Sequence, residues 1–315
     1  MTIRELGRSG LKVAPLALGC NVFGWTASPA QSFEVLDAFV EAGGNLIDTA
    51  DMYSIWVPGH TGGESETLIG QWLASRGLRH KILIATKAGM DMGGGRKGLS
   101  APYLRSAVDD SLKRLGVDCI DLYQAHADDA QTPLEETLGA FADMIRAGKV
   151  RAIGASNYSS ARLAEAISVS ARLGLPRFET LQPQFNLLDR AKFEGDLQNL
   201  CVRENISVIP YYSLAAGFLS GKYRTEADLA GRARAGRVRD YLNERGLRVL
   251  AAVDDVAKRL GTTQTAVAIA WVRDRPAIAA PIASATSAAQ LQALIAGMRL
   301  ALDTAALAQL DEASA

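Results

Sequence analysis

The chain has 315 residues, of which 34 are Lys or Arg and 34 are Asp or Glu, so its formal net charge is zero. Hydrophobic residues make up 48% and charged residues 22%, the composition of a globular protein that can bury a large core. This balance gives no reason to expect nucleic acid or a membrane surface as a partner, and no apolar run reaches the roughly 18 residues that a transmembrane helix needs.

The first predicted element is a β-hairpin over residues 2–13, with its turn at Arg8-Ser9-Gly10. Eight short apolar runs rich in strand-forming residues follow it, at residues 15–19, 45–48, 81–87, 119–126, 150–156, 178–182, 206–211 and 277–283. Stretches with a helical period separate them, as in a parallel sheet built from βαβ units. Eight such units predict a (β/α)8 TIM barrel, with an open doubly wound sheet as the alternative. We expect the hairpin to cap the bottom of the barrel, where the strands begin.

Several helices carry start and stop signals. Ser100 with Pro102 begins one that ends at Gly116, and Ser159 or Ser160 begins another that ends at Gly174. Thr132-Pro133-Leu134-Glu135 has the pattern of a capping box with proline at the first helical position. The long gap between the last two strands holds an arginine-rich loop and two predicted helices, at residues 244–260 and 263–273, and a last helix starts at Asp303. Without a linker or low-complexity segment, residues 1–315 are expected to form a single domain.

Four chemically matched side chains follow three successive strands. Asp48 and Tyr53 follow the second strand, Lys87 ends the third and His126 ends the fourth. The active site of a (β/α)8 barrel lies at these strand ends. A lysine ammonium close to a tyrosine lowers the tyrosine pKa, and a carboxylate keeps that lysine charged. The tyrosine can then exchange a proton with an alkoxide, while the histidine orients a carbonyl oxygen.

These residues belong to longer motifs: Asn-Leu-Ile-Asp-Thr-Ala-Asp-Met-Tyr, Ile-Ala-Thr-Lys, Asp-Leu-Tyr-Gln-Ala-His, Ile-Gly-Ala-Ser-Asn-Tyr and Gly-Phe-Leu-Ser-Gly-Lys-Tyr. In this order they resemble the aldo-keto reductases, and the resemblance runs from Arg4 to about Leu294. It implies NAD(P)H-dependent reduction of carbonyl compounds without a Rossmann domain. It also implies that Tyr53 is the general acid, that Lys87 and Asp48 tune it, and that His126 orients the substrate.

The resemblance carries over to a set of cofactor residues. Besides Asp48, those beside or on the nicotinamide would be Gly19, Cys20, Asn21, Ser156, Asn157, Gln182 and Tyr211. Those holding the pyrophosphate would be Gly217, Leu219, Gly221 and Lys222. Those around the adenosine phosphate would be Ser284, Thr286 and Gln290. NADPH is the expected cofactor. Because the last three residues are neutral, where many NADPH-using relatives carry Lys or Arg, NADH stays open as the alternative. Whether the loop from Arg232 to Arg239 covers the cofactor is left open.

Other roles follow from position alone. Phe23, Trp25 and Trp56 lie in mouth loops and are candidate walls for a small carbonyl or alcohol substrate, with ordinary loop packing as the alternative. The spacing of histidines indicates no metal site. Cys20, Cys119 and Cys201 are far apart and indicate reduced thiols, and the polar N-terminus is unlike a signal peptide, so a cytoplasmic protein is expected.

Two other functions stay open from the sequence. One is a nicotinamide-binding regulatory subunit with weak turnover, as in the potassium-channel beta subunits that resemble this family. The other is a dehydrogenase of sugars or secondary alcohols, because the same residues serve both directions of the reaction. The sequence names neither the physiological substrate nor the oligomeric state.

Overall fold

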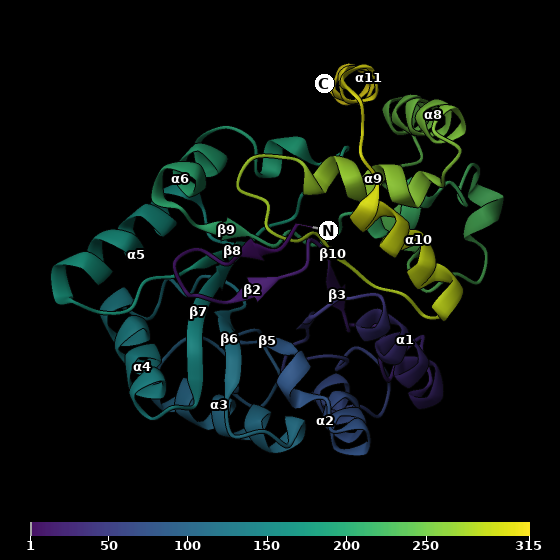
Figure 1. The fold of residues 1–315 in the computed structure, drawn as a ribbon. Helices are drawn as coiled ribbons and strands as arrows, with labels where there is room; N and C mark the ends of the chain where they lie inside the picture. Colours follow the sequence, from purple (N-terminus) through teal and green to yellow (C-terminus); the bar gives the residue numbers. More distant parts are fainter. Residues whose placement is uncertain (1) are drawn as a thin grey trace.

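The computed structural model describes residues 2–315, and its centre is a sheet of eight strands (Figure 1). Every neighbouring pair in this sheet is parallel, in the order β10-β3-β4-β5-β6-β7-β8-β9. The strands are β3 (Ala17–Gly19), β4 (Leu46–Asp48), β5 (Leu83–Ala88), β6 (Ile120–Ala125), β7 (Val150–Ser156), β8 (Thr180–Gln182), β9 (Ser207–Val208) and β10 (Ile282–Ala283). All eight fall within the apolar runs predicted from the sequence or extend them by one residue.

The ring closes between β9 and the segment that leads into β10. Val208 forms two hydrogen bonds with this segment: its N donates to Ala277 O, and its O accepts from Ala279 N, both at 2.8 Å. It thereby forms a parallel bridge with Ile278. Ile282 N reaches Pro210 O at 2.9 Å. The (β/α)8 barrel is therefore confirmed, and the open doubly wound alternative is wrong.

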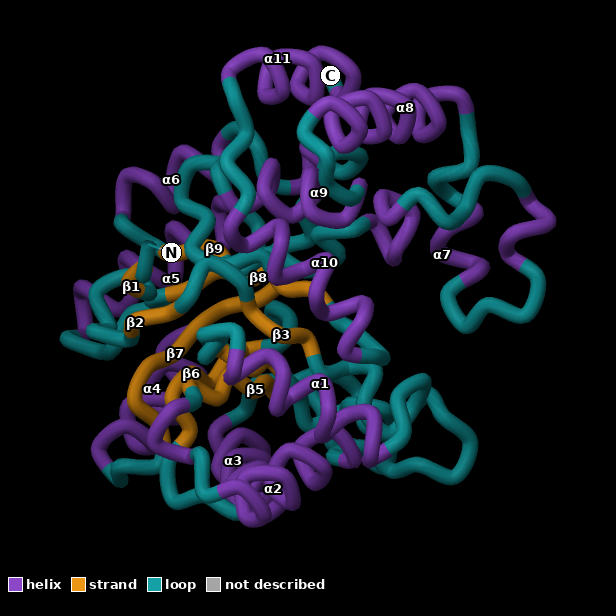
Figure 2. The backbone as a smooth tube through the Cα atoms, turned by 45° about the vertical axis from the view of Figure 1, so that its right-hand side comes forward, coloured by secondary structure: helices purple, strands orange, loops and turns teal. Residues whose placement is uncertain are grey.

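Helices surround this ring (Figure 1). They are α1 (Pro29–Glu41), α2 (Glu64–Arg76), α3 (Ala101–Leu115), α4 (Leu134–Arg146), α5 (Ser160–Leu173), α6 (Asp196–Glu204), α7 (Ala235–Arg239), α8 (Glu244–Arg259), α9 (Gln264–Arg273), α10 (Ala288–Arg299) and α11 (Thr304–Ser314). Short 3-10 turns lie at Arg79–Lys81, Arg190–Lys192, Ala215–Ser220 and Glu226–Leu229. Figure 2 shows α8 and α11 side by side on the outer side of α9, with α7 in a loop that projects away from the ring.

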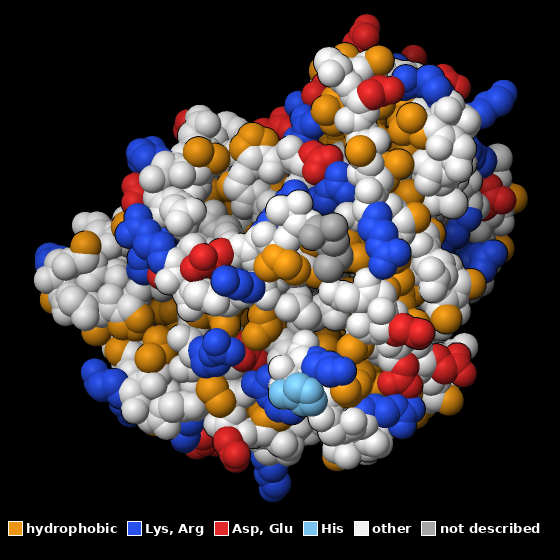
Figure 3. Space-filling view, in the orientation of Figure 1, with side chains coloured by type: hydrophobic (Ala, Val, Ile, Leu, Met, Phe, Trp, Pro, Cys, Tyr) orange, Lys and Arg blue, Asp and Glu red, His pale blue; other side chains and the backbone are white. Residues whose placement is uncertain are grey.

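The predicted hairpin is formed by β1 (Arg4–Glu5) and β2 (Lys12–Val13), which pair antiparallel. Leu6, Leu11 and Val13 are buried together with residues from the barrel interior such as Leu46 and Leu122. Gly7 N also donates to Ser207 Oγ at 2.8 Å, at the beginning of β9. The hairpin therefore closes the end of the barrel where the strands begin, as expected. Figure 3 views the face that carries it, where positive and negative side chains are interspersed.

The helix boundaries confirm most of the predicted signals and correct one. Ser100 and Ser159 are N-cap residues, Gly116 and Gly174 are left-handed C-caps with φ of 64° and 63°, and α11 is capped by Asp303. The capping box predicted at Thr132 is wrong. Pro133 is the N-cap of α4 and no side chain caps it, because the Thr132 hydroxyl donates to Asp129 Oδ2 at 2.6 Å.

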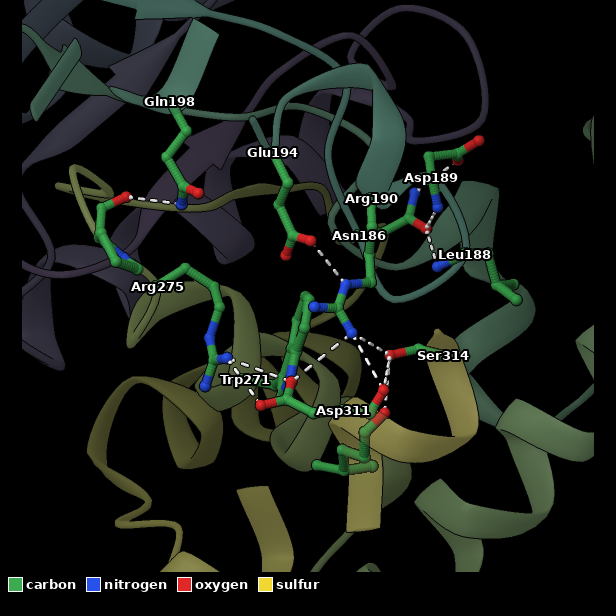
Figure 4. A network of polar contacts seen from close by, with 12 residues as sticks. Asn186, Leu188, Asp189, Arg190, Glu194, Gln198, Trp271, Arg275, Asp311 and Ser314 are labelled. Carbon is green, nitrogen blue, oxygen red and sulfur yellow. Dashed lines mark hydrogen bonds and ion pairs between the residues drawn. The ribbon is translucent and has the colours of Figure 1, made fainter. Parts of the chain in front are cut away.

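The helix α11 is held by groups from distant parts of the chain (Figure 4). Trp271 Nε1 donates to Asp311 Oδ1 at 2.8 Å, and Arg275 Nη1 reaches both oxygens of the same carboxylate at 3.1 Å. Arg190 Nη1 donates to Ser314 Oγ at 2.9 Å and to Asp311 O at 3.1 Å. Both guanidinium groups also lie over the Trp271 ring, so polar and cation–π contacts together fix the helix.

No single helix within residues 2–315 is long and apolar enough to cross a lipid bilayer. The pair α10 and α11, counted together, is long and apolar enough for a span by length and composition, but the two helices are bent by 112° relative to each other.

Candidate functional site

A cavity of about 640 Å³ opens at the end of the barrel opposite the hairpin. It is lined by residues at the ends of the eight strands and in the loops that follow them. Of the site residues predicted from the sequence, those on its lining are Gly19, Asn21, Asp48, Tyr53, Trp56, His126, Ser156, Asn157, Gln182, Tyr211, Gly217, Lys222, Ser284, Thr286 and Gln290. The mouth of the barrel therefore brings together residues that are far apart in the sequence.

Lys87 and Asp48 form an ion pair beneath this cavity. Lys87 is completely buried, and its Nζ donates to Asp48 Oδ1 and to Thr49 O, both at 2.7 Å. The strand register explains the pairing, because Asp48 lies opposite Ala85, which points to the same side of β5 as Lys87. Burial lowers the pKa of Lys87, but its interactions with Asp48 and Tyr53 raise it more, so its net pKa lies above the ordinary value. The ammonium group is therefore kept charged in a completely buried position.

Two glutamines hold the other oxygen of Asp48. Gln182 Nε2 donates to Asp48 Oδ2 at 2.8 Å, and Gln124 Nε2 approaches the same atom at 3.4 Å. Space for Gln124 comes from Gly154 beside it, where a Cβ atom would lie 3.1 Å from Gln124 Cγ and 2.1 Å from Thr180 Oγ1. The carboxylate thus accepts bonds from both sides, which fixes its orientation. Gln182 was expected beside the nicotinamide, and in the structure its amide nitrogen supports Asp48.

Tyr53 lies on the cavity side of this pair. Lys87 Nζ is 4.8 Å from the centroid of its ring, and the Trp56 ring packs edge-on against it at 5.7 Å. Burial raises the pKa of Tyr53, the Lys87 ammonium lowers it, and the Asp48 carboxylate raises it; the net direction is upward. The sequence led us to expect a lowered pKa. The lysine does act in that direction, but the loss of water around the phenol outweighs it.

His126 faces Tyr53 across the cavity, with the two ring centroids 5.9 Å apart. Burial, and then the positive charge of Lys87, hold the pKa of His126 well below its usual value. Its Nδ1 is buried and finds no hydrogen-bond partner within residues 2–315. The ring is therefore a neutral imidazole, able to donate one N–H without adding charge.

A second cluster of hydrogen-bonded polar side chains lies at the end of β7. Asn157 Nδ2 donates to His126 O and to Ser156 Oγ, both at 3.0 Å, and Asn157 Oδ1 accepts from the Tyr211 hydroxyl at 2.8 Å. Ser156 Oγ in turn donates to Gln182 O at 2.9 Å. Burial raises the pKa of Tyr211 to about 12, so its hydroxyl stays protonated. The chain could hold a carboxamide between Ser156 and Asn157, next to a flat aromatic ring.

The loop after β9 turns sharply at its glycines. Gly217 has a φ of 101° and Gly221 a φ of 80°, conformations that other residues adopt only with strain. Lys222 folds back over this turn. Its Nζ lies 3.7 Å from the position that a Cβ atom would occupy if residue 217 were not glycine, and 5.0 Å from the centroid of the Tyr223 ring. It forms no ion pair with any carboxylate among residues 2–315, so this part of the loop could hold a phosphate. Leu219 is completely buried and can act there only through its backbone.

The loop before α10 closes the opposite end of the cavity. Ser287 is the N-cap of this helix, and Gln290 Oε1 accepts from Thr286 N and Oγ1, at 3.0 and 3.2 Å. Ser284 Oγ donates to Asn21 Oδ1 at 2.7 Å, which joins this loop to the end of β3. A Cβ atom on Gly19 would come within 2.8 Å of Ile282 and Ser284, so glycine lets the end of β3 lie close against β10 and the loop that follows it.

Three further predicted site residues lie behind the cavity or beside it. Cys20 is completely buried, and burial raises the pKa of its thiol. Phe23 is also completely buried, because its loop closes on itself through a bridge with Ala27, so it does not line the cavity. Trp25 packs edge-on against Trp56 at 5.6 Å and supports it from outside the cavity.

Sequence reasoning missed Gln124 and did not distinguish Arg234 from the other arginines of its loop. Gln124 could have been found by alternation, because it lies opposite Lys87 in the strand register. Arg234 lines the cavity, whereas Arg224 is paired with Asp254 and Arg239 with Glu226. Within residues 2–315 no three His, Cys, Asp or Glu side chains are grouped to hold a metal ion.

Nearly the whole chain matches the model of one protein family. The model of the aldo/keto reductase family matches residues 15–315. The chain belongs to the aldo/keto reductase family. It is 34% identical to Protein tas of Escherichia coli (strain K12), over 99% of this chain and 97% of that protein.

Two further relatives differ in what they are named for. The chain is 32% identical to a probable voltage-gated potassium channel subunit beta of Arabidopsis thaliana, over 93% of this chain and 89% of that protein. It is 29% identical to L-glyceraldehyde 3-phosphate reductase of Escherichia coli (strain K12), over 99% of this chain and 92% of that protein. Membership of the family makes the chain an oxidoreductase by descent, and reductases and a channel subunit both occur among its relatives.

Proposed function

We propose that this protein reduces aldehydes or ketones to alcohols, or catalyses the reverse oxidation, with NADPH as its preferred cofactor. One observation carries the proposal: a tyrosine hydroxyl, a buried Lys–Asp pair and a neutral histidine lie around one cavity at the mouth of the barrel. These groups suit proton transfer to a carbonyl oxygen, and the proposal assigns that task to Tyr53.

The proton chemistry follows from the surroundings of Tyr53. With its pKa raised by burial, Tyr53 carries its proton at neutral pH and can give it to a developing alkoxide. The phenolate left behind is stabilised by the Lys87 ammonium, whose own charge is maintained by Asp48. His126, as a neutral imidazole, donates its N–H to the same carbonyl oxygen and orients it.

The residues of the cavity suit a nicotinamide dinucleotide. Its volume of about 640 Å³ leaves room for such a ligand, and Gly19 and Gly217 on its lining carry no side chain. When bound, the reduced nicotinamide supplies a hydride. Ser156 and Asn157 would hold its carboxamide and Tyr211 would lie against its ring.

The phosphates would lie at the two loops that follow β9 and β10. The turn at Gly217 and Gly221, with Lys222, would hold the pyrophosphate. Ser284, Thr286 and Gln290 would lie around the adenosine phosphate. Because these three are neutral, a 2′-phosphate would depend on hydroxyl groups and backbone N–H groups at the start of α10. NADPH held in this way is the proposed cofactor, and the lack of a positive charge at these three positions keeps NADH as the alternative.

The name of one relative supports a second candidate. A chain similar to a channel subunit beta could bind the cofactor, turn over slowly and serve a partner protein. The relative named as a reductase of a phosphorylated aldehyde supports the enzyme instead.

The two functions can be separated in one experiment. The protein is titrated with NADPH and with NADH by fluorescence, and the oxidation of each is then followed with a panel of aldehydes and ketones and, in reverse, with sugars and secondary alcohols. Turnover that depends on a carbonyl substrate supports the enzyme. Tight cofactor binding without turnover on any member of the panel would support the regulatory subunit.

A further inference from the structure

The loop after β4 carries both Tyr53 and Trp56 to the mouth of the barrel. It runs over residues 49–63 without a helix or a strand, and two of its glycines, Gly62 and Gly63, have left-handed φ angles of 90° and 88°. A segment of this kind has no ladder of backbone bonds to fix it. The position of the Tyr53 hydroxyl therefore depends on the contacts that the loop makes with its neighbours.

The start of α2 makes the first of these contacts. Gly63 is the N-cap of this helix, and no side chain within residues 2–315 caps it. The Tyr53 carbonyl takes that place, because it accepts from Gly63 N and from Ser65 N, both at 3.1 Å. The backbone of the proposed proton donor thus satisfies N–H groups of the kind that a helix leaves free in its first turn.

Glu64, the first residue of α2, holds the loop a second time. Its Oε2 accepts from Ser54 N at 3.1 Å, and its Oε1 accepts from Thr61 N at 2.8 Å. Hydrogen bonds to a carboxylate are roughly twice as strong as those between neutral groups. One side chain therefore joins the residue that follows Tyr53 to the far end of the loop, and fastens both to the helix.

The neighbours of Glu64 keep it in this position. The Ser54 hydroxyl lies 3.1 Å from His60 Nδ1, which in turn lies 3.9 Å from Glu64 Oε2. Gly24 of the loop after β3 comes so close that a Cβ atom on it would be 3.3 Å from Glu64 Cβ. Glu64 itself is not part of the cavity lining, so it influences a ligand there through the loop that it holds.

We propose that Glu64 is a positioning residue, which sets the place of the Tyr53 hydroxyl against the substrate by fastening the loop at Ser54 and Thr61. The inference rests on the proposed function, in which Tyr53 gives a proton to the carbonyl oxygen. Reacting groups must meet within a narrow range of distances, and a displacement of about 1 Å can lower a rate about 100-fold. A tie one residue away from the proton donor is therefore well placed to control turnover.

The main test is Glu64→Ala, assayed with NADPH and 4-nitrobenzaldehyde. The variant leaves Ser54 N and Thr61 N without their acceptor, so kcat should fall about tenfold or more. The dissociation constant of NADPH, measured by fluorescence titration, should stay nearly as it is, because Glu64 lies outside the cavity lining. Glu64→Gln keeps one side-chain oxygen as an acceptor and should lose less. An unchanged kcat in Glu64→Ala would overturn the proposal, and so would an equal loss of NADPH affinity.

Glu244→Ala is the matched control. Glu244 is likewise the first residue of its helix, α8, but it is exposed and lies outside the cavity lining. Both variants remove a negative charge from the start of a helix, where the macrodipole favours it. The kcat of Glu244→Ala should equal that of the parent. A fall of the same size in this control would mean that charge, and not the bonds to the loop, is responsible, and would overturn the proposal.

Hydrogen exchange tests the tie without any turnover. The Ser54 and Thr61 amides are bonded to Glu64 in the parent, so in Glu64→Ala they should exchange about tenfold faster or more, in the peptide that spans residues 53–63. Faster exchange confined to this loop supports the inference even if the parent does not reduce the aldehyde, in which case only the proposed function fails. Equal exchange in both proteins would overturn it. If Glu64→Ala exchanges faster over the whole chain, Glu64→Gln takes its place, and an unchanged loop and kcat in that variant would overturn the proposal.

Discussion

Lys87 lies behind Tyr53, on the side away from the cavity: its Nζ is 4.8 Å from the ring centroid, and the side chain is completely buried. It is absent from the cavity lining, to which Tyr53 and Asp48 belong. The lysine therefore acts on a bound substrate only through Tyr53. This separates the role of the tyrosine, which can exchange a proton with the substrate, from that of the lysine, which sets how readily it does so.

The first prediction concerns Tyr53. Tyr53→Phe removes the hydroxyl but keeps the ring that packs on Trp56, so carbonyl reduction should fall by roughly 10²–10⁴-fold. NADPH affinity should stay nearly as it is. Steady-state kinetics and fluorescence titration measure the two quantities. Tyr158→Phe is the control, because Tyr158 is a buried tyrosine of the outer core whose hydroxyl has no partner among residues 2–315. Full activity in Tyr53→Phe would rule out Tyr53 as the acid.

The second prediction concerns Lys87. Lys87→Met leaves Asp48 buried with only amide partners, so the variant should lose about 3–5 kcal/mol of unfolding free energy as well as its turnover. The pKa of Tyr53 should rise further, because Lys87 is the group that lowers it. Chemical denaturation and a spectroscopic titration of tyrosine measure these effects.

The double variant Lys87→Met/Asp48→Asn separates the two consequences. It removes the unpaired charge, so stability should partly return while turnover stays low. If turnover returned together with stability, the lysine would be a structural residue and its effect on Tyr53 would be unimportant.

Much of the candidate site could be predicted from the position of its residues relative to the ends of the predicted strands. Lys87 and His126 could be placed at one mouth because each closes an apolar run, and parallel strands of a barrel end on the same face. The partner of Gln182 could not be predicted, since it depends on which side chains meet across the barrel interior.

Loop residues were less predictable. Phe23 was expected in the cavity wall, but the bridge to Ala27 turns it into the core. Arg234 was one of four arginines in a run, and only the fold of the segment before α7 decides which of them lines the cavity. The net pKa of Tyr53 was also beyond the sequence, because the size of the desolvation depends on how completely the phenol is buried.

The third prediction concerns cofactor choice. Gln290 lies in the first turn of α10 and bonds the turn at Thr286 through Oε1. Gln290→Arg would place a guanidinium where a 2′-phosphate is proposed, so the preference for NADPH over NADH should rise about tenfold. Gln290→Met is the matched control, since it loses the bond to Thr286 without gaining charge. The ratio of dissociation constants for the two cofactors measures the effect, and an equal change in both variants would mean that the 2′-phosphate lies elsewhere.

The last prediction concerns Asp51, which is buried two residues before Tyr53. Its Oδ1 has no hydrogen-bond partner among residues 2–315, and its Oδ2 accepts only a long bond of 3.4 Å from the Tyr103 hydroxyl. Burial, and then the negative charge of Glu66, raise the pKa of Asp51 to about 7, against the opposing charge of Arg114. In the unfolded chain the pKa returns to about 4. The folded protein therefore holds a proton that the unfolded chain releases, and the free energy of unfolding should decrease as pH rises from about 4 to about 7.

Asp51→Asn stays neutral at every pH and so removes this contribution. Near pH 4 the parent and the variant should have similar stability. Near pH 8 the variant should be more stable by up to about 4 kcal/mol, an upper bound from about 1.4 kcal/mol per pKa unit. Urea denaturation of both proteins across this range measures the difference, in which the titration of other groups cancels. Parallel pH profiles would show that Asp51 titrates at its ordinary pKa, and that this buried carboxylate close to Tyr53 stays charged at neutral pH.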